Sequence, residues 1–206
     1  AQEELDRAIT MYEKAIALDP KYTATYNNLG NVFKAQEEMD RAIAMYEKAI
    51  ELDPKYAAAY NNLGNVFSDQ EKWDQAIAMY EKAIELDPED NDAYHSVGWS
   101  YLLLGNMEQA HHYLLQTWDL SKQKHTHAPM NIGHVHLLKA NRSAAIQWYR
   151  TSLSLWEDKE AFFKGMEEDY LDLKMEERGI SKDAYEVILK ELRGKVENEE
   201  VNQQNE

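Results

Sequence analysis

Histidine is the residue type of this sequence that could most readily support chemistry, because all seven histidines lie between His95 and His136. Imidazole is a common ligand of zinc, and a helix that holds a metal ion places its ligands three or four residues apart. The closely spaced histidines are only one or two residues apart: His111 with His112, His125 with His127, and His134 with His136. Side chains at these spacings point in different directions on a helix. We therefore expect no metal site.

Catalytic groups of other kinds are equally poorly supported. General acid–base catalysis needs a carboxylate whose pKa is raised by burial, and the adjacent carboxylates fall on polar faces or in turns: Glu37-Glu38, Glu167-Glu168 and Glu176-Glu177. The chain has no cysteine, which excludes thiolate nucleophiles and disulfides. Gly194-Lys195 lacks the upstream glycine and strand of a phosphate-binding loop. We expect a protein that is not an enzyme and needs no cofactor.

The charge of the chain makes nucleic acid and acidic membranes poor candidate partners. The 206 residues include 38 acidic and 22 basic side chains, which give a formal net charge of −16. Binding of nucleic acid or of an acidic membrane surface needs clustered Lys and Arg, so we expect neither. No apolar run approaches the roughly 18 residues that span a bilayer, and residues 1–20 do not have the order of a signal peptide. We expect a soluble chain and favour a cytoplasmic location.

The elements that must position any binding residues follow from an internal repeat of 34 residues. The tripeptide Leu-Asp-Pro recurs at this interval, with its prolines at Pro20, Pro54 and Pro88. A second shared segment, AxYNNLGNVF, occupies residues 24–33 and 58–67. The tripeptide ends a longer shared segment, DxAIAMYEKAIxLDP, at residues 40–54 and 74–88. The two longer segments repeat about three quarters of each unit almost letter for letter, so each unit is expected to form the same structure.

Each unit has two apolar stripes at helical spacing, which predict two helices, here named A and B, that pack face to face. Tyr26, Leu29 and Phe33 fall on one face of helix A, as expected for an amphipathic helix that packs against its neighbour. A glycine inside a helix costs roughly 1 kcal/mol relative to alanine. Gly30 is therefore expected to pair with Ala42 and to let the two backbones approach closely, and the same pair recurs 34 residues later. The residue before each proline disfavours the α region and ends helix B.

These features resemble the tetratricopeptide repeat family, whose eight signature positions are all filled in two units. The first unit has Tyr26, Leu29, Gly30, Phe33, Ala42, Tyr46, Ala49 and Pro54, and the second has Tyr60, Leu63, Gly64, Phe67, Ala76, Tyr80, Ala83 and Pro88. The resemblance implies an all-α fold, a right-handed α-solenoid of tetratricopeptide helix-turn-helix repeats with C-terminal capping helices. In such a solenoid the A helices line a concave groove.

The same resemblance divides the chain into segments of one solenoid domain. They are helix B of a truncated repeat (1–22), two full repeats (23–56 and 57–90), two degenerate repeats (91–125 and 126–158), capping helices (159–195) and an acidic disordered tail (196–206). Pro129 requires helix A of the last repeat to start late. In the cap we expect one long helix over 159–176, a stop at Gly179, and a last helix with Ser181 as its N-cap.

The family's groove-facing positions can be assigned to side chains, which are amides in the N-terminal half and aromatic or apolar in the C-terminal half. The expected groove residues are Asn27, Asn28, Asn31, Asn61, Asn62, Asn65, His95, Trp99, Asn131, His134 and Leu138. An asparagine both donates and accepts, so a row of them can bind the backbone of an extended peptide. This resembles the asparagine ladder in the superhelix of a protein glycosyltransferase. The alternative interpretation is that asparagine is simply a common, soluble choice at these positions.

Trp99 also has two interpretations. It either anchors a partner, because a large aromatic side chain is costly to leave in water, or it packs against the degenerate repeats or a C-terminal helix folded into the groove. His95 and His134 are interpreted as polar, pH-sensitive contacts for a partner. The basic clamp with which some family members grip chaperone tails is missing, since its basic positions hold Asn27, Asp92 and Ser96. We do not expect binding of Hsp70-type or Hsp90-type tails.

The function expected from this pattern is a protein–protein interaction module that binds a peptide or a partner protein in the groove. The first alternative is a structural scaffold that forms a homo-oligomer through the exposed N-terminal helix, or through Phe162 and Tyr170. The second alternative is the substrate-recognition arm of a larger enzyme, such as a protein glycosyltransferase.

Overall fold

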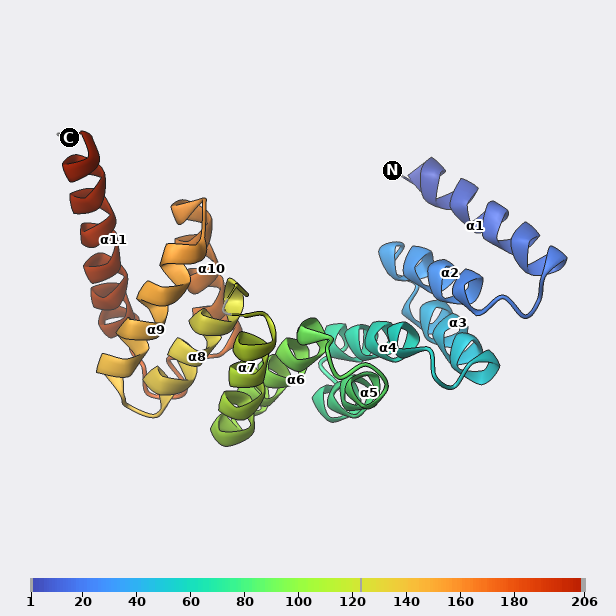
Figure 1. Ribbon diagram of the computed structural model, residues 1–206, viewed down its shortest axis with the longest axis horizontal. Helices are drawn as coiled ribbons and strands as arrows, with labels where there is room; N and C mark the ends of the chain where they lie inside the picture. Colours follow the sequence, from blue (N-terminus) through green and yellow to red (C-terminus); the bar gives the residue numbers. More distant parts are fainter. Residues whose placement is uncertain (1, 123, 205–206) are drawn as a thin grey trace. The chain divides into compact units, whose positions relative to one another are not determined.

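The structure is a computed structural model that describes residues 2–122 and 124–204, and over these ranges the chain forms helices and no strand (Figure 1). The helices are α1 (Gln2–Leu18), α2 (Thr23–Ala35), α3 (Met39–Leu52), α4 (Ala57–Asp69), α5 (Trp73–Leu86), α6 (Asn91–Leu104), α7 (Met107–Leu120), α8 (His127–Leu138), α9 (Arg142–Leu155), α10 (Lys159–Asp172) and α11 (Lys182–Gln204). The predicted all-α fold is confirmed. The chain divides into two compact units, an N-terminal unit up to Ser100 and a C-terminal unit from Tyr101.

The N-terminal unit is a stack of helix pairs in sequence order. Helix α2 packs against α3 and α4 against α5, while α1 packs on α2 and α3 on α4 (Figure 1). The signature alanines and tyrosine of α3 are completely buried at the centre of this stack: Ala42, Tyr46 and Ala49. Small and large side chains thus alternate along helix B, so that it fits closely against the helices on both sides.

Close packing within each pair depends on the glycine of helix A. A Cβ atom added to Gly30 would lie 2.6 Å from the ring of Tyr46, and one added to Gly64 would lie 2.7 Å from the ring of Tyr80. The sequence predicted close approach at these glycines but assigned Ala42 as the partner of Gly30, whereas the nearest atoms belong to the tyrosine. The glycine therefore makes room for the tyrosine ring close to the backbone of helix A.

The turn from helix A to helix B recurs with the same backbone conformation. Glu37, Glu71 and Ala140 have positive φ angles of 62°, 56° and 58°, and Gly105 occupies the equivalent place with φ of 81°. A left-handed residue reverses the chain just after a helix ends. The conformation of the turns therefore repeats along the chain, as the helices do.

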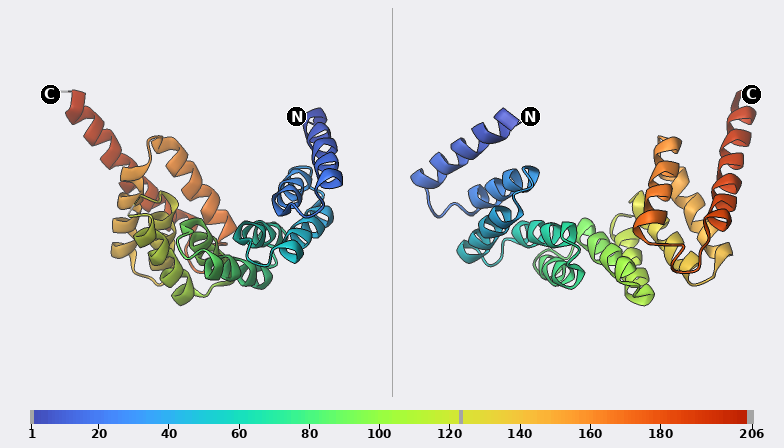
Figure 2. Two further views of the ribbon diagram at one scale, coloured as in Figure 1. Left: turned by 45° about the vertical axis from the view of Figure 1, so that its right-hand side comes forward. Right: turned by 180° about the vertical axis from the view of Figure 1, so that it is seen from behind.

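The C-terminal unit contains α7, α8, α9 and the two last helices. Pro129 lies in the first turn of α8, as predicted, and Ser181 caps α11 by accepting a hydrogen bond of 3.2 Å from the amide of Ala184. Helix α7 packs on α8, α8 on α9, and α9 on α11 (Figure 2).

The boundaries of the last two helices differ from the prediction. Helix α10 ends at Asp172 and not at residue 176, because Lys174 adopts a φ angle of 48° and the turn that follows buries Leu173 and Met175 completely. Helix α11 continues to Gln204, past residue 196, where we expected a disordered tail to begin. The end of that expected tail, residues 205–206, lies outside the described residues.

Candidate peptide-binding surface

The six asparagines of the first two A helices form one surface, which we name the amide face (Asn27, Asn28, Asn31, Asn61, Asn62 and Asn65). On α2, Asn28 and Asn31 are exposed while Asn27 is buried. On α4, all three asparagines are half-buried. The amide face therefore combines solvent-exposed amides with amides that are held by the protein.

The orientation of two of these amides is set by tyrosines of the B helices. The Tyr46 hydroxyl donates to Asn31 Oδ1 at 2.7 Å, and the Tyr80 hydroxyl donates to Asn65 Oδ1 at 2.8 Å. Burial raises the pKa of each tyrosine to about 12, so both hydroxyls keep their proton at neutral pH. With its carbonyl bound in this way, each amide directs its two Nδ2–H donors away from the tyrosine.

Other polar contacts join consecutive repeats across the amide face. Asn62 Nδ2 donates to Asn27 Oδ1 at 2.8 Å, and Asn27 is buried. Beyond it, Lys34 Nζ on α2 lies 3.0 Å from Asp69 Oδ2 on α4. Asn27 therefore serves as a link between A helices, and its role as a direct contact for a partner is not supported by its buried position.

His95 and Trp99 extend the expected surface onto α6. Both side chains are half-buried. This partial burial fits both interpretations of Trp99, as an anchor for a partner and as a packing residue. The two residues remain predicted contacts.

In the C-terminal unit the prediction is wrong for two residues. Asn131 and His134 were expected in an open groove, but Asn131 is buried and His134 is completely inaccessible to solvent. Their helix is covered by the chain's own last helices: His134 Nε2 lies 3.1 Å from the hydroxyl of Tyr185 on α11 and His134 Nδ1 lies 3.6 Å from Asp169 on α10. The third expected residue, Leu138, is half-buried.

We name α10, α11 and the turn between them the cap. Besides its contacts to His134, the cap reaches the last turn of α6, where both terminal nitrogens of Arg178 donate to backbone carbonyls, to Leu102 at 2.8 Å and to Leu103 at 2.6 Å. The last carbonyls of a helix have no intrahelical partner, so this arginine caps α6. A single arginine in a polar segment gave no sequence signal for this contact. In this unit the apolar inner face is therefore occupied from within the chain, which was one of the alternatives considered for it.

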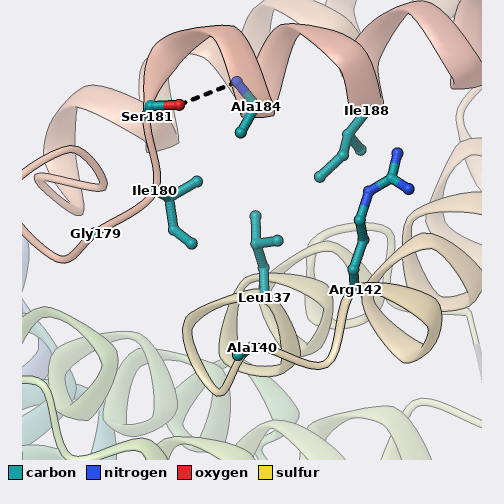
Figure 3. A pocket seen from close by; sticks show the side chains of 8 residues that line it. All are labelled: Leu137, Ala140, Arg142, Gly179, Ile180, Ser181, Ala184 and Ile188. Carbon is teal, nitrogen blue, oxygen red and sulfur yellow. Dashed lines mark hydrogen bonds between the residues drawn. The ribbon is translucent and has the colours of Figure 1, made fainter.

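A small hollow remains where the cap meets the α8–α9 turn. It has a volume of about 250 Å³. Its lining comes from Leu137, Ala140 and Arg142 on one side and from Gly179, Ile180, Ser181, Ala184 and Ile188 on the other (Figure 3). The aliphatic side chains of the two sides point toward each other across it (Figure 3).

The histidines are dispersed over this unit and α6. The rings of His111 and His136 are 5.1 Å apart between centroids, and burial lowers the pKa of both. Within residues 2–122 and 124–204, no three His, Cys, Asp or Glu side chains are grouped as metal ligands. Over the same residues no helix has the length and apolar character needed to cross a membrane.

Comparison with known proteins identifies the repeat in the N-terminal part of the chain. A family model for the tetratricopeptide repeat matches residues 22–89 and 55–123, and a second model for the TPR repeat matches residues 1–37. No curated protein matches the sequence significantly.

Solved structures resemble the fold over most of the chain. A crystal structure of MamA is 28% identical, with 78% of this chain and 92% of that chain covered at a TM-score of 0.69. MamA 41-end from Desulfovibrio magneticus RS-1 is 16% identical, with 73% and 85% covered at a TM-score of 0.67. A chain of the APC/C hetero-tetramer Cut9-Hcn1 is 22% identical, with 92% of this chain and 36% of that chain covered at a TM-score of 0.69. The last two show likeness of fold alone.

Proposed function

Since this chain belongs to the tetratricopeptide repeat family, we propose that the amide face of its N-terminal unit binds an extended segment of a partner protein. The matched repeat family and the MamA solenoid are consistent with a protein interaction scaffold. The partner would lie along α2 and α4, which carry the exposed and the half-buried amides of this face.

The observation that carries this proposal is the repeated tyrosine–asparagine bond. Because the hydroxyls of Tyr46 and Tyr80 bind the carbonyls of Asn31 and Asn65, the same donor group is presented once per repeat in the same orientation. Donors that are already oriented lose little conformational freedom on binding. Main-chain carbonyls of an extended peptide are the acceptors that such a row fits, because every residue of a peptide supplies one.

A peptide array probed with the full chain, followed by titration calorimetry of the best peptide, tests this proposal. We expect the double substitution Asn31→Ala and Asn65→Ala to weaken binding by about 2 kcal/mol, or roughly thirtyfold, from two lost hydrogen bonds of about 1 kcal/mol each. Gln75→Ala is the matched control, because Gln75 is an exposed amide on the B helix α5. Trp99→Ala tests whether the site extends onto α6. Equal affinity of the double variant and the Gln75 variant would reject the amide face.

Self-association is a second candidate function, and the surface of α1 favours it. Met11 is 66% exposed and Leu18 88% exposed, and α1 residues Ala8, Tyr12 and Ala15 are only half-buried, although their counterparts on α3 are fully buried. A second copy could cover this face. Sedimentation of the chain with and without residues 1–20 separates the two functions, because a chain that is monomeric at all concentrations excludes the scaffold.

A further inference from the structure

Two buried polar atoms face each other between α8 and the cap. His134 Nδ1 lies 3.6 Å from Asp169 Oδ2, and neither atom has a hydrogen-bond partner among the described residues. The His134 side chain is completely buried, and that of Asp169 is 16% exposed. Buried polar atoms in folded proteins are nearly always bonded, so two that face each other at this distance need an explanation.

The hydrogen bonds of Tyr185 identify the tautomer of His134. The Tyr185 hydroxyl donates its single proton to the backbone carbonyl of Met166 at 2.9 Å. Its oxygen can then only accept from His134 Nε2, which lies 3.1 Å away. Nε2 therefore carries a proton, and Nδ1, which faces Asp169, is the nitrogen whose proton is not yet accounted for.

The contact between His134 Nδ1 and Asp169 Oδ2 can hold no proton, one proton or two protons, and only the state with one proton is favourable. With no proton between Nδ1 and Oδ2, two acceptors face each other. With two protons, two donors face each other and the buried imidazole is charged, which is costly. A single proton places one donor opposite one acceptor, and an approach of a few tenths of an ångström from the present 3.6 Å would complete a hydrogen bond between them.

We propose that His134 and Asp169 hold one proton between them, and that this shared proton holds the cap over the inner face of α8 as a pH-sensitive closure. The same cluster joins three elements, because Tyr185 of α11 is bonded both to His134 of α8 and to Met166 of α10. Loss of the proton loosens the cap at this point. The hollow between the cap and the α8–α9 turn, lined by Leu137 of α8 and Ala184 of α11, shows that the cap is not packed completely against this unit (Figure 3).

The surroundings of the pair disfavour charge on either member. The ring of Tyr149 from α9 lies 5.3 Å from that of His134, and the ring of Tyr170 lies 4.9 Å from that of Tyr185. Burial raises the pKa of Asp169 to about 7, assisted by the neighbouring carboxylates of Asp172 and Glu168 on α10. Burial lowers the pKa of His134 to about 3. The charged neighbour of Tyr185 on α10 is also acidic, Glu167. The proton therefore resides on Asp169.

The pH dependence follows from comparing protons in the folded and unfolded chain. Ordinary pKa values are about 3.9 for aspartate and 6.5 for histidine. Between pH 4 and 6.5 the unfolded chain holds one proton, on His134, and the folded pair also holds one, so the pair adds no pH dependence. Above pH 6.5 the unfolded chain loses that proton while the folded pair keeps it, so cap stability falls as pH rises until Asp169 is deprotonated.

Nitrogen-15 NMR of the histidines in the unaltered chain tests the proton arrangement directly. At pH 5.5 we expect His134 to be neutral, with its proton on Nε2. Its Nδ1 resonance should shift as pH rises through about 7, when Asp169 loses the shared proton. A His134 that becomes charged near pH 6.5, or that carries its only proton on Nδ1, overturns the proposal.

Amide hydrogen exchange of the cap tests the closure. Between pH 6.5 and about 7 we expect the opening equilibrium of α10 and α11 to rise by about threefold in total, relative to α4 and α5 after correction for intrinsic rates. Asp169→Asn should abolish this rise, because its amide donates to Nδ1 at any pH. Asp119→Asn, an exposed aspartate on α7, should behave as the unaltered chain does. A rise that persists in Asp169→Asn, or is missing from the unaltered chain, contradicts the closure.

Discussion

The hydroxyl groups of Tyr46 and Tyr80 show how one buried atom can both stabilise a helix pair and orient a surface residue. Each hydroxyl lies at the boundary between the core and the amide face and donates to an asparagine on the partner helix. Because the tyrosine rings are buried against glycine, the hydroxyls have little freedom to move. The direction of each amide therefore depends on packing within the pair.

Replacing Tyr80 by phenylalanine should change stability in a pH-dependent way. Near pH 8 we expect a loss of about 1 kcal/mol from the missing hydrogen bond. Burial raises the pKa of Tyr80 to about 12, whereas a tyrosine of the unfolded chain has a pKa near 10. Between these values the folded chain keeps a proton that the unfolded chain loses, so stability falls as pH rises from 10 to 12.

Urea unfolding at pH 8 and pH 11.5 measures this difference. The loss of stability between the two pH values should be smaller in Tyr80→Phe than in the unaltered chain. Tyr22→Phe is the control, because Tyr22 is 60% exposed, and it should leave the alkaline loss unchanged. An identical alkaline loss in all three proteins would show that the Tyr80 hydroxyl is not protected by burial.

At the scale of helices, the repeat is held together by a contact between the glycine of helix A and the tyrosine of helix B. The same contact occurs at Gly30, Gly64 and Gly133, each against the tyrosine that follows 16 residues later. It recurs even in the degenerate repeat of the C-terminal unit. The glycine is therefore required by its surroundings and not by its backbone conformation.

Substitution of Gly64 by alanine tests the importance of this contact. The new Cβ would lie 2.7 Å from the Tyr80 ring, so the ring or the helix must shift, at a cost of about 1–3 kcal/mol. Thermal unfolding followed by circular dichroism should show a lower midpoint. Gly194→Ala in α11 is the matched control, because a Cβ atom at this position meets no atom within 4 Å. This substitution should stabilise the helix by about 0.5–1 kcal/mol. Equal effects at the two glycines would contradict close helix packing as the cause.

At the scale of the whole molecule, 38 acidic and 22 basic side chains give a net charge of −16. Excess charge of one sign destabilises a compact chain through self-repulsion. Salt shortens the distance over which charges interact, from about 30 Å at 0.01 M to about 10 Å at 0.1 M. The acidic excess therefore makes stability dependent on ionic strength.

Raising sodium chloride from 0.01 M to 0.1 M at pH 7.5 should raise the thermal midpoint by a few degrees, which corresponds to about 1 kcal/mol. The control is the same titration near pH 4.8, the isoelectric point of the sequence, where repulsion is balanced and the midpoint should change little. Scanning calorimetry measures both. A salt effect of equal size at the two pH values would indicate specific ion binding in place of screening.

The sequence by itself determined the helix pairs, the end of helix B at each proline and the helices that carry the asparagines of the amide face. These features depend on residues close in sequence, since a 34-residue repeat of small, aromatic and proline positions specifies one packed unit at a time. The N-cap Ser181 and the position of Pro129 in α8 were predictable for the same reason.

Only the tertiary structure decided what covers Asn131 and His134. Their burial depends on residues of α10 and α11, and the Tyr185 hydroxyl that contacts His134 comes from 51 residues further along the chain. The amphipathic pattern of the cap indicated that it must pack, but not against which surface. Periodicity shows which face of a helix is apolar, whereas the partner of that face is chosen by shape and by polar contacts between distant residues.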